Sequence, residues 1–191
     1  MWDPRGRGGA GIRYLIDRRT FLGACGAALT WPLLRPAWAG DAGAGTRSGG
    51  LSAEAVKALE KSEFAYISPL RSDGRESTCH GEVWYAWLDG AVVVNTAATT
   101  WKARSLKRGL DRARIWVGNH GTWKRAMGRN DDFRKAPSFE AKAVLVKDDA
   151  VIDRLLGVFD AKYPDEIGEW RKRMRDGYFD GSRPLIRYMP V

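Results

Sequence analysis

The sequence predicts an α+β fold in which a barrel-like sheet is accompanied by short helices. Two observations favour this class over a doubly wound parallel sheet. Residues 83–95 form the clearest β-hairpin pattern of the chain, because two runs rich in valine and aromatic residues flank the turn sequence Asp89-Gly90. In addition, strand patterns and short helix patterns follow one another in a mixed order, whereas a parallel sheet needs a regular alternation of the two.

The elements are predicted from local patterns, in chain order. Ser52 is placed to cap a helix over 51–62, in which apolar residues recur at helical spacing. A strand over 64–68 ends at Pro69, and turn residues follow it. After the hairpin we expect a helix at 100–108, a strand at 112–117, a long loop at 118–137, a strand at 139–147, helices at 151–163 and 165–175, and a strand at 184–189.

Residues 1–39 have the three parts of an export signal, so they are excluded from the fold. The pair Arg18-Arg19 precedes an apolar run at 21–34, and the run is followed by the small-x-small processing site Ala37-Trp38-Ala39. A twin-arginine signal directs a protein to the machinery that exports folded chains. Insertion of a cofactor in the cytoplasm is a common reason for that route, so the leader favours a cofactor-carrying protein. We expect a periplasmic or otherwise exported product.

Two other interpretations of the leader are weaker. An uncleaved membrane anchor needs roughly twenty apolar residues, and the run here is about fourteen residues long and is interrupted by Pro32. Lipidation at Cys25 would require a cysteine at the end of the apolar run, but Cys25 lies near its beginning. The mature form is therefore expected to have no membrane span.

The remaining chain is predicted to consist of a flexible Gly/Ala/Ser-rich linker at 40–50 and one domain at 51–191. The domain has about 140 residues, which is enough to form a single hydrophobic core. The whole chain has a net charge of +9, and much of that charge lies in the leader. The moderately basic domain argues against a nucleic-acid-binding protein. Cys79 would be the one cysteine left after processing, which excludes an internal disulfide or a cysteine metal clip.

The densest group of polar residues follows the hairpin, at 95–105. Hydroxyl side chains precede Lys102 and Arg104 at the point where a strand leads into a helix. Free backbone N–H groups, hydroxyls, an ammonium and a guanidinium together suit a phosphate group. A solvated basic helix face that continues to Arg108 is the alternative, and the composition does not decide between them.

The order of these segments resembles the pyridoxamine-5′-phosphate-oxidase-like family of FMN-binding split barrels. The resemblance covers roughly residues 51–123. The segments that carry it are 64–68, Asp73-Gly74, 83–90, 92–96, 99–106 and 112–116.

This resemblance implies an antiparallel split β-barrel with flanking helices, which forms a homodimer with a flavin at the interface. It implies that Thr100, Lys102 and Arg104 bind the FMN phosphate. Asn95 and Thr96 would lie near the ring or the ribityl chain, and Trp84 would flank the ring. Some relatives use the deazaflavin F420 or haem instead, so these remain the alternative cofactors.

The implied function is an exported flavin-dependent oxidoreductase that acts on a small molecule or exchanges electrons with a redox partner. The alternative is a non-catalytic protein on the same fold that binds haem, flavin or a pyridoxal-type vitamer. The C-terminal Arg/His pattern of the oxidases is missing beyond Arg183 and Arg187, so pyridoxamine phosphate is not the expected substrate. No catalytic residue and no metal ligand are identified.

The histidines and Cys79 are interpreted conservatively. His80 is interpreted as a turn residue rather than as a proton donor or haem ligand. His120 lies in the long loop, where a role at the site stays open. Cys79 is expected to be a small buried residue, since no His/Asp arrangement beside it indicates a nucleophile.

Overall fold

The computed structural model describes residues 50–121, 124–125 and 128–191, with side-chain positions described outside 122–129. The predicted leader at 1–39 and nearly all of the predicted linker at 40–50 lie outside these ranges. In the part that is described, no helix has the length and apolar character needed to cross a bilayer.

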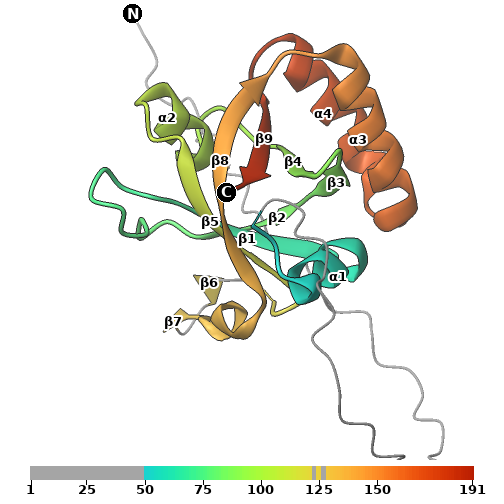
Figure 1. Ribbon diagram of the computed structural model, residues 1–191. Coiled ribbons are helices and arrows are strands. Elements are labelled where there is room, and N and C mark those ends of the chain that lie inside the picture. Colours follow the sequence, from blue (N-terminus) through green and yellow to red (C-terminus); the bar gives the residue numbers. More distant parts are fainter. Residues whose placement is uncertain (1–49, 122–123, 126–127) are drawn as a thin grey trace, which may run out of the picture. The chain divides into compact units, whose positions relative to one another are not determined.

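The domain is built on a seven-stranded sheet in the order β2-β1-β5-β8-β9-β4-β3, and every neighbouring pair is antiparallel (Figure 1). The strands are β1 (Phe64–Pro69), β2 (Gly81–Trp84), β3 (Ala86–Leu88), β4 (Ala91–Asn95), β5 (Arg112–Val117), β8 (Ser138–Val146) and β9 (Leu185–Pro190). Two short strands, β6 (Lys124–Arg125) and β7 (Gly128–Arg129), pair separately. The predicted α+β class is confirmed.

The sheet closes into a split barrel because its two edge strands are neighbours in the chain. Only Tyr85 separates β2 from β3, although they lie at opposite edges. The Tyr85 side chain is fully buried, and its hydroxyl lies 2.9 Å from the backbone oxygens of both Leu59 and Ser62. The Tyr85 backbone N–H donates to the hydroxyl of Tyr163 at 3.3 Å. Helices on both sides therefore hold the residue at which the barrel is split.

This arrangement corrects the predicted hairpin. The turn at Asp89-Gly90 is confirmed, with φ values of 50° and 71° that suit a two-residue turn. The first arm, however, is two strands and not one: β3 pairs with β4, whereas β2 pairs with β1. The break at Tyr85 redirects the chain from one edge of the sheet to the other.

Alternation along the strands creates the barrel interior. On β5, for example, Ala113, Ile115 and Val117 point inward, and Phe139 and Ala141 of β8 meet them there. Helix α1 (Ala53–Lys61) adds Leu59 to the same core, and its N-cap Ser52 accepts a hydrogen bond from the Ala55 N–H at 3.1 Å.

A second core lies outside the barrel. Helices α3 (Asp149–Lys162) and α4 (Ile167–Phe179) pack side by side, and α3 lies against β3 (Figure 1). Leu155, Leu156 and Phe159 of α3 are completely buried there together with Val93 of β4. The helical layer thus covers the outer face of the β3–β4 hairpin.

The other predictions are confirmed within one to four residues, with two corrections. Helix α2 (Trp101–Lys107) and strands β1, β5, β8 and β9 lie where the patterns placed them, and α4 extends further than predicted. The segment 118–137 is not a plain loop, because it contains the β6–β7 ribbon and a 3₁₀ helix, η1 (Asp132–Lys135). Phe133 of η1 is buried in a third apolar cluster with Tyr66 and Trp116.

Candidate functional site

The predicted site residues lie around the turn between β4 and α2. Thr100 is the N-cap of α2, but its hydroxyl does not cap the helix. Instead it donates to the backbone oxygen of Ala97 at 2.8 Å and lies 3.2 Å from the hydroxyl of Thr96. The two threonines therefore support each other across the turn that leads into the helix.

Asn95, at the end of β4, joins this turn to the segment before β9. Its amide nitrogen donates to the backbone oxygen of Arg183 at 2.7 Å, and its amide oxygen accepts from the Arg183 Nε at 2.9 Å. The side chain of Arg183 crosses α4 at Gly177, where a methyl group would lie 2.6 Å from the Arg183 Cγ. Both polar atoms of the Asn95 side chain therefore bind Arg183 and hold it in position.

Lys102 has the most unusual environment of the predicted residues. Its side chain is only 8% exposed, and its ammonium lies directly over Gly81 of β2, where a methyl group would come within 2.1 Å of Nζ. Within the described ranges, no hydrogen bond or ion pair joins this amine to another residue. Burial lowers the pKa of Lys102, and the nearby Cys79 partly offsets that effect.

Arg104 lies on the other side of α2 and is exposed. It borders a hollow of about 460 Å³, here called the α2 pocket, which is lined by Arg71, Ser77, Thr78, Cys79, Trp101 and Arg104. The lining thus contains two guanidinium groups, two hydroxyls, a thiol and an indole, and it contains no carboxylate. Such a lining suits an anion better than a cation.

The indole of Trp101 strengthens the positive character of this pocket. The guanidinium carbon of Arg104 lies 5.9 Å from the ring centroid, and that of Arg108 lies 5.2 Å from it. Both arginines are held over the ring by cation–π attraction. Of the residues near the pocket, Arg71 has an acidic partner, Asp73, at 3.5 Å.

Trp84 lies away from this group. Its ring stacks on Tyr163 with centroids 4.3 Å apart and contacts Phe159 edge-on at 5.9 Å. Trp84 is therefore packed against α3, at the end of β2 opposite Gly81, and not beside the α2 pocket.

Sequence reasoning missed the contribution of the β1–β2 connection. Arg71, Ser77, Thr78 and Cys79 reach the pocket from a segment more than twenty residues before α2. No local pattern indicates that contact, since it depends on how β1 and β2 pair. The expectation for Cys79 is corrected, because this residue is exposed and not buried.

The two histidines both lie near the third apolar cluster, which includes Tyr66, Trp116 and Phe133. His80 is 7% exposed, its ring packs near Phe133 and Trp116, and its Nε2 lies 3.3 Å from an amino group of Arg134. His80 thus lies in the connection between β1 and β2, as expected, and it is buried there. The backbone N–H of His120 donates to the hydroxyl of Tyr66 at 3.0 Å. Among the described residues, no group of three or more His, Cys, Asp or Glu side chains could hold a metal.

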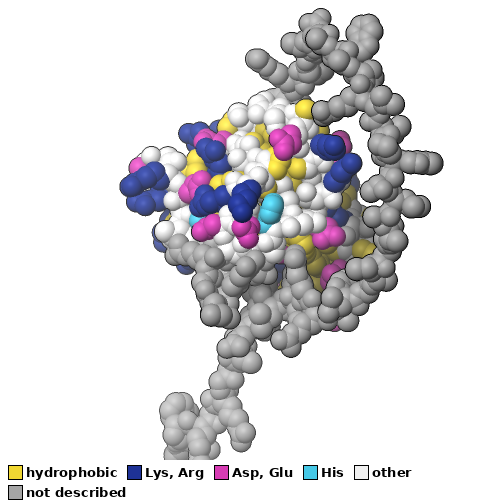
Figure 2. All heavy atoms as spheres, turned by 90° about the horizontal axis from the view of Figure 1, so that it is seen from below, with side chains coloured by type: hydrophobic (Ala, Val, Ile, Leu, Met, Phe, Trp, Pro, Cys, Tyr) yellow, Lys and Arg dark blue, Asp and Glu magenta, His cyan; other side chains and the backbone are white. Residues whose placement is uncertain are grey.

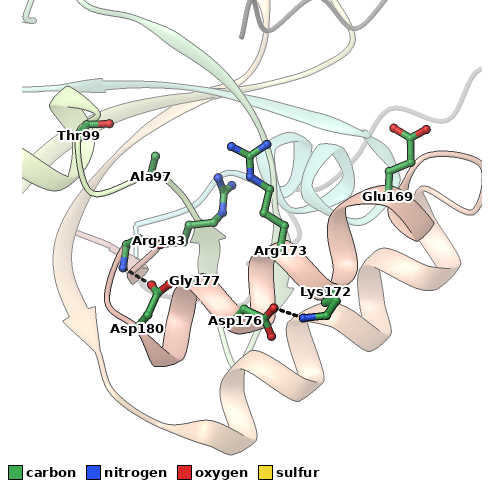
Figure 3. A pocket seen from close by; sticks show the side chains of 10 residues that line it. Ala97, Thr99, Glu169, Lys172, Arg173, Asp176, Gly177, Asp180 and Arg183 are labelled. Atoms are coloured by element: carbon green, nitrogen blue, oxygen red, sulfur yellow. Dashed lines mark hydrogen bonds and ion pairs between the residues drawn. The ribbon is translucent and has the colours of Figure 1, made fainter. Parts of the chain in front are cut away.

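A second hollow, of about 580 Å³, lies between α4 and the turn after β4 (Figure 3). Its lining carries both signs of charge, and its Lys172 and Asp176 form an ion pair. Mixed charge also covers the face in Figure 2, where basic and acidic side chains lie next to each other. The α2 pocket differs from both in having basic groups and no acid.

Comparisons with known proteins bear on the fold. Neither a protein-family model nor a curated protein sequence matches this chain. Two solved structures match with a TM-score of 0.50. HutZ, the heme storage protein from Vibrio cholerae, is 14% identical, and the match covers 74% of this chain and 91% of HutZ. A conserved hypothetical protein from Mycobacterium tuberculosis is 20% identical, with coverages of 75% and 84%.

A third structure has a lower score. It is described provisionally as a pyridoxamine 5′-phosphate oxidase from Listeria innocua, with 11% identity, coverages of 71% and 89% and a TM-score of 0.44. At such identities a likeness shows the fold. The chain has a split-barrel fold, which it shares with HutZ. The predicted split barrel is confirmed.

Proposed function

We propose that this chain is an exported flavin-binding oxidoreductase of the split-barrel type, with FMN as its cofactor. One observation carries the proposal: Lys102 is more than nine-tenths buried, and its ammonium has no ion-pair partner among the described residues. A buried charge without a partner is costly. A bound phosphate would supply the missing negative charge.

The surroundings of Lys102 support a phosphate ligand. Gly81 leaves room for the ammonium, and the adjacent α2 pocket presents Arg104, whose planar fork matches phosphate oxygens. The hydroxyls of Thr96 and Thr100 lie at the start of the same helix. These residues fit the phosphate end of FMN. The deazaflavin F420 also carries a phosphate, so it is the nearest alternative cofactor.

The division of labour follows from these positions. When bound, the flavin would supply hydride or electron transfer. Lys102 and Arg104 would hold and neutralise the phosphate, and Asn95 would keep Arg183 and the segment before β9 in place. The chain's residues would therefore bind and orient the cofactor, and none of them is assigned as an acid or a base.

A non-catalytic haem-binding protein is the second candidate. It is favoured by the likeness to HutZ, which is a heme storage protein with the same fold. The acid-free lining of the α2 pocket would suit haem propionates as well as a phosphate. The buried amine of Lys102 favours the phosphate, because it offers a compact positive charge for a single anionic group.

Export through the twin-arginine machinery is part of the proposal and rests on Arg18-Arg19 and the apolar run that follows. The homodimer rests on the resemblance to the family. Replacement of both arginines by lysine should retain the protein in the cytoplasm, which fractionation of the expressing cells would show. Unchanged export of that variant would contradict the assignment of the leader.

The first experiment is the visible absorption spectrum of the full-length chain expressed in a host with an intact twin-arginine pathway. Flavin bands would support the proposal, and a Soret band would favour the haem candidate. FMN affinity should then be measured for Lys102→Ala/Arg104→Ala and for the control Lys57→Ala/Lys107→Ala, which removes two exposed charges. Equal FMN affinity in the two double variants would refute the phosphate site.

A further inference from the structure

Cys79 places a thiol in the acid-free α2 pocket. It is exposed, and it shares the lining of that pocket with Arg71 and Arg104. Arg71 is paired with Asp73 at 3.5 Å, so a negatively charged reagent that enters the pocket is attracted chiefly by Arg104, which has no acidic partner among the described residues.

A buried cation lies behind this thiol. The ammonium of Lys102 lies over Gly81, two residues after Cys79, and the residue as a whole is 8% exposed. The thiol lies near enough that a negative charge on it would raise the pKa of Lys102, against the larger effect of burial. Among the described residues, the ammonium has no ion-pair partner.

We propose that Cys79 is a thiol–disulfide exchange site that selects small disulfides carrying carboxylate groups, with Arg104 and Lys102 as the selecting cations. Oxidised glutathione belongs to this chemical class. The inference rests on the charge of the α2 pocket and does not require a bound flavin.

The reaction balances without a further oxidant. The Cys79 thiolate attacks one sulfur of the disulfide, a new sulfur–sulfur bond forms, and the original one breaks. The second half of the disulfide leaves as a thiolate with the electron pair and takes up a proton. Cys79 is oxidised and the departing thiol is reduced, and the product carries its carboxylates beside Arg104 and Arg71. A phosphate and this adduct would then exclude each other from the α2 pocket.

The test compares two disulfide reagents on the full chain freed of cofactor, with Cys25→Ser so that Cys79 is the only thiol. Dithiobis-nitrobenzoate carries two carboxylates, and dithiodipyridine is uncharged. Arg104→Gln should slow the charged reagent roughly threefold to tenfold and leave the uncharged one within about twofold, since one nearby cation is removed. Added salt should reduce the same difference.

The matched control is Lys107→Gln, an exposed lysine on the same helix that should change neither rate. Lys102→Met should also slow the charged reagent and leave the uncharged one nearly unchanged. Because Arg104 is exposed, Arg104→Gln should fold normally, so the test remains valid even if Lys102→Met folds poorly. Equal effects of Arg104→Gln on both reagents, or none on either, would overturn the inference. So would failure of oxidised glutathione to form a mixed disulfide at Cys79, observed by mass spectrometry.

Addition of FMN separates this inference from the proposed function. If FMN slows the charged reagent, both the phosphate site and the exchange site lie in the α2 pocket. If FMN has no effect while the charge preference persists, the exchange site stands and the phosphate assignment fails. If the charge preference is absent in a protein that still binds FMN at Lys102, the phosphate assignment stands and the exchange site fails.

Discussion

Replacement of Lys102 by methionine should change stability and anion affinity in opposite directions. Methionine keeps the apolar stem of the side chain and removes an ammonium that is unpaired within the described ranges, at a residue that is 8% exposed. Removing an uncompensated buried charge relieves a penalty of several kcal/mol, of which we expect about 1–3 kcal/mol to be realised as added stability. For a domain of about 140 residues this corresponds to a rise in Tm of roughly 3–10 °C.

The same substitution should weaken phosphate binding. A hydrogen bond to a charged group contributes about 1.5–3 kcal/mol, so the Kd for FMN should rise roughly 10- to 150-fold. Thermal unfolding of the cofactor-free protein and quenching of FMN fluorescence measure the two effects. Lys107→Met, an exposed change on the same helix, should alter neither. A cofactor-free Lys102→Met protein that is less stable and binds FMN normally would refute the reasoning.

Three further variants test other parts of the structure. Gly81→Ala places a methyl group 2.1 Å from the Lys102 Nζ and should weaken FMN binding about tenfold or more. Gly157→Ala is the control, because its methyl group meets nothing within 4 Å and should leave FMN binding unchanged. Fluorescence titration with FMN compares the two variants. Burial lowers the pKa of Lys162 to about 7. Its burial cost is therefore fully present below that pH, and stability should rise between about pH 7 and 10.4 as the folded state loses the proton first. Lys162→Met should reduce this rise in urea unfolding and add about 1–2 kcal/mol at pH 6; an unchanged pH profile would contradict the assignment. Tyr85→Phe removes the hydroxyl contacts with Leu59 and Ser62 and should cost about 1–2 kcal/mol in the same assay, and a cost near zero would exclude a stabilising role for that hydroxyl.

The elements that depend on neighbouring residues could be predicted from the sequence. The Asp89-Gly90 turn and the Ser52 cap are local, because each follows from the conformational preferences of a few adjacent residues. The break at Tyr85 could not be predicted, since its partners are Leu59, Ser62 and Tyr163, which lie far away in the chain. A run of strand-forming residues from 83 to 88 has no internal sign of that interruption.

The candidate site was predictable in composition and not in geometry. The two interpretations of the basic segment after β4 each describe part of it: Arg104, Lys107 and Arg108 are exposed, as on a solvated face, whereas Lys102 is buried. The difference arises because Lys102 is on the side of α2 that meets Gly81, and that contact depends on the position of β2. The contribution of Cys79 depends on the same pairing.

The position of β9 determines when this domain can fold. Strand β9 pairs with β4 on one side and β8 on the other, and so joins the β3–β4 hairpin to the other strands of the sheet. Among the described strands it is also the last in chain order. During synthesis, the hairpin must therefore wait for residues 185–190 to leave the ribosome before it can be incorporated. Closure of the barrel should therefore follow the synthesis of its other strands, and deletion of these few residues should leave β3–β4 unpaired with the rest of the sheet.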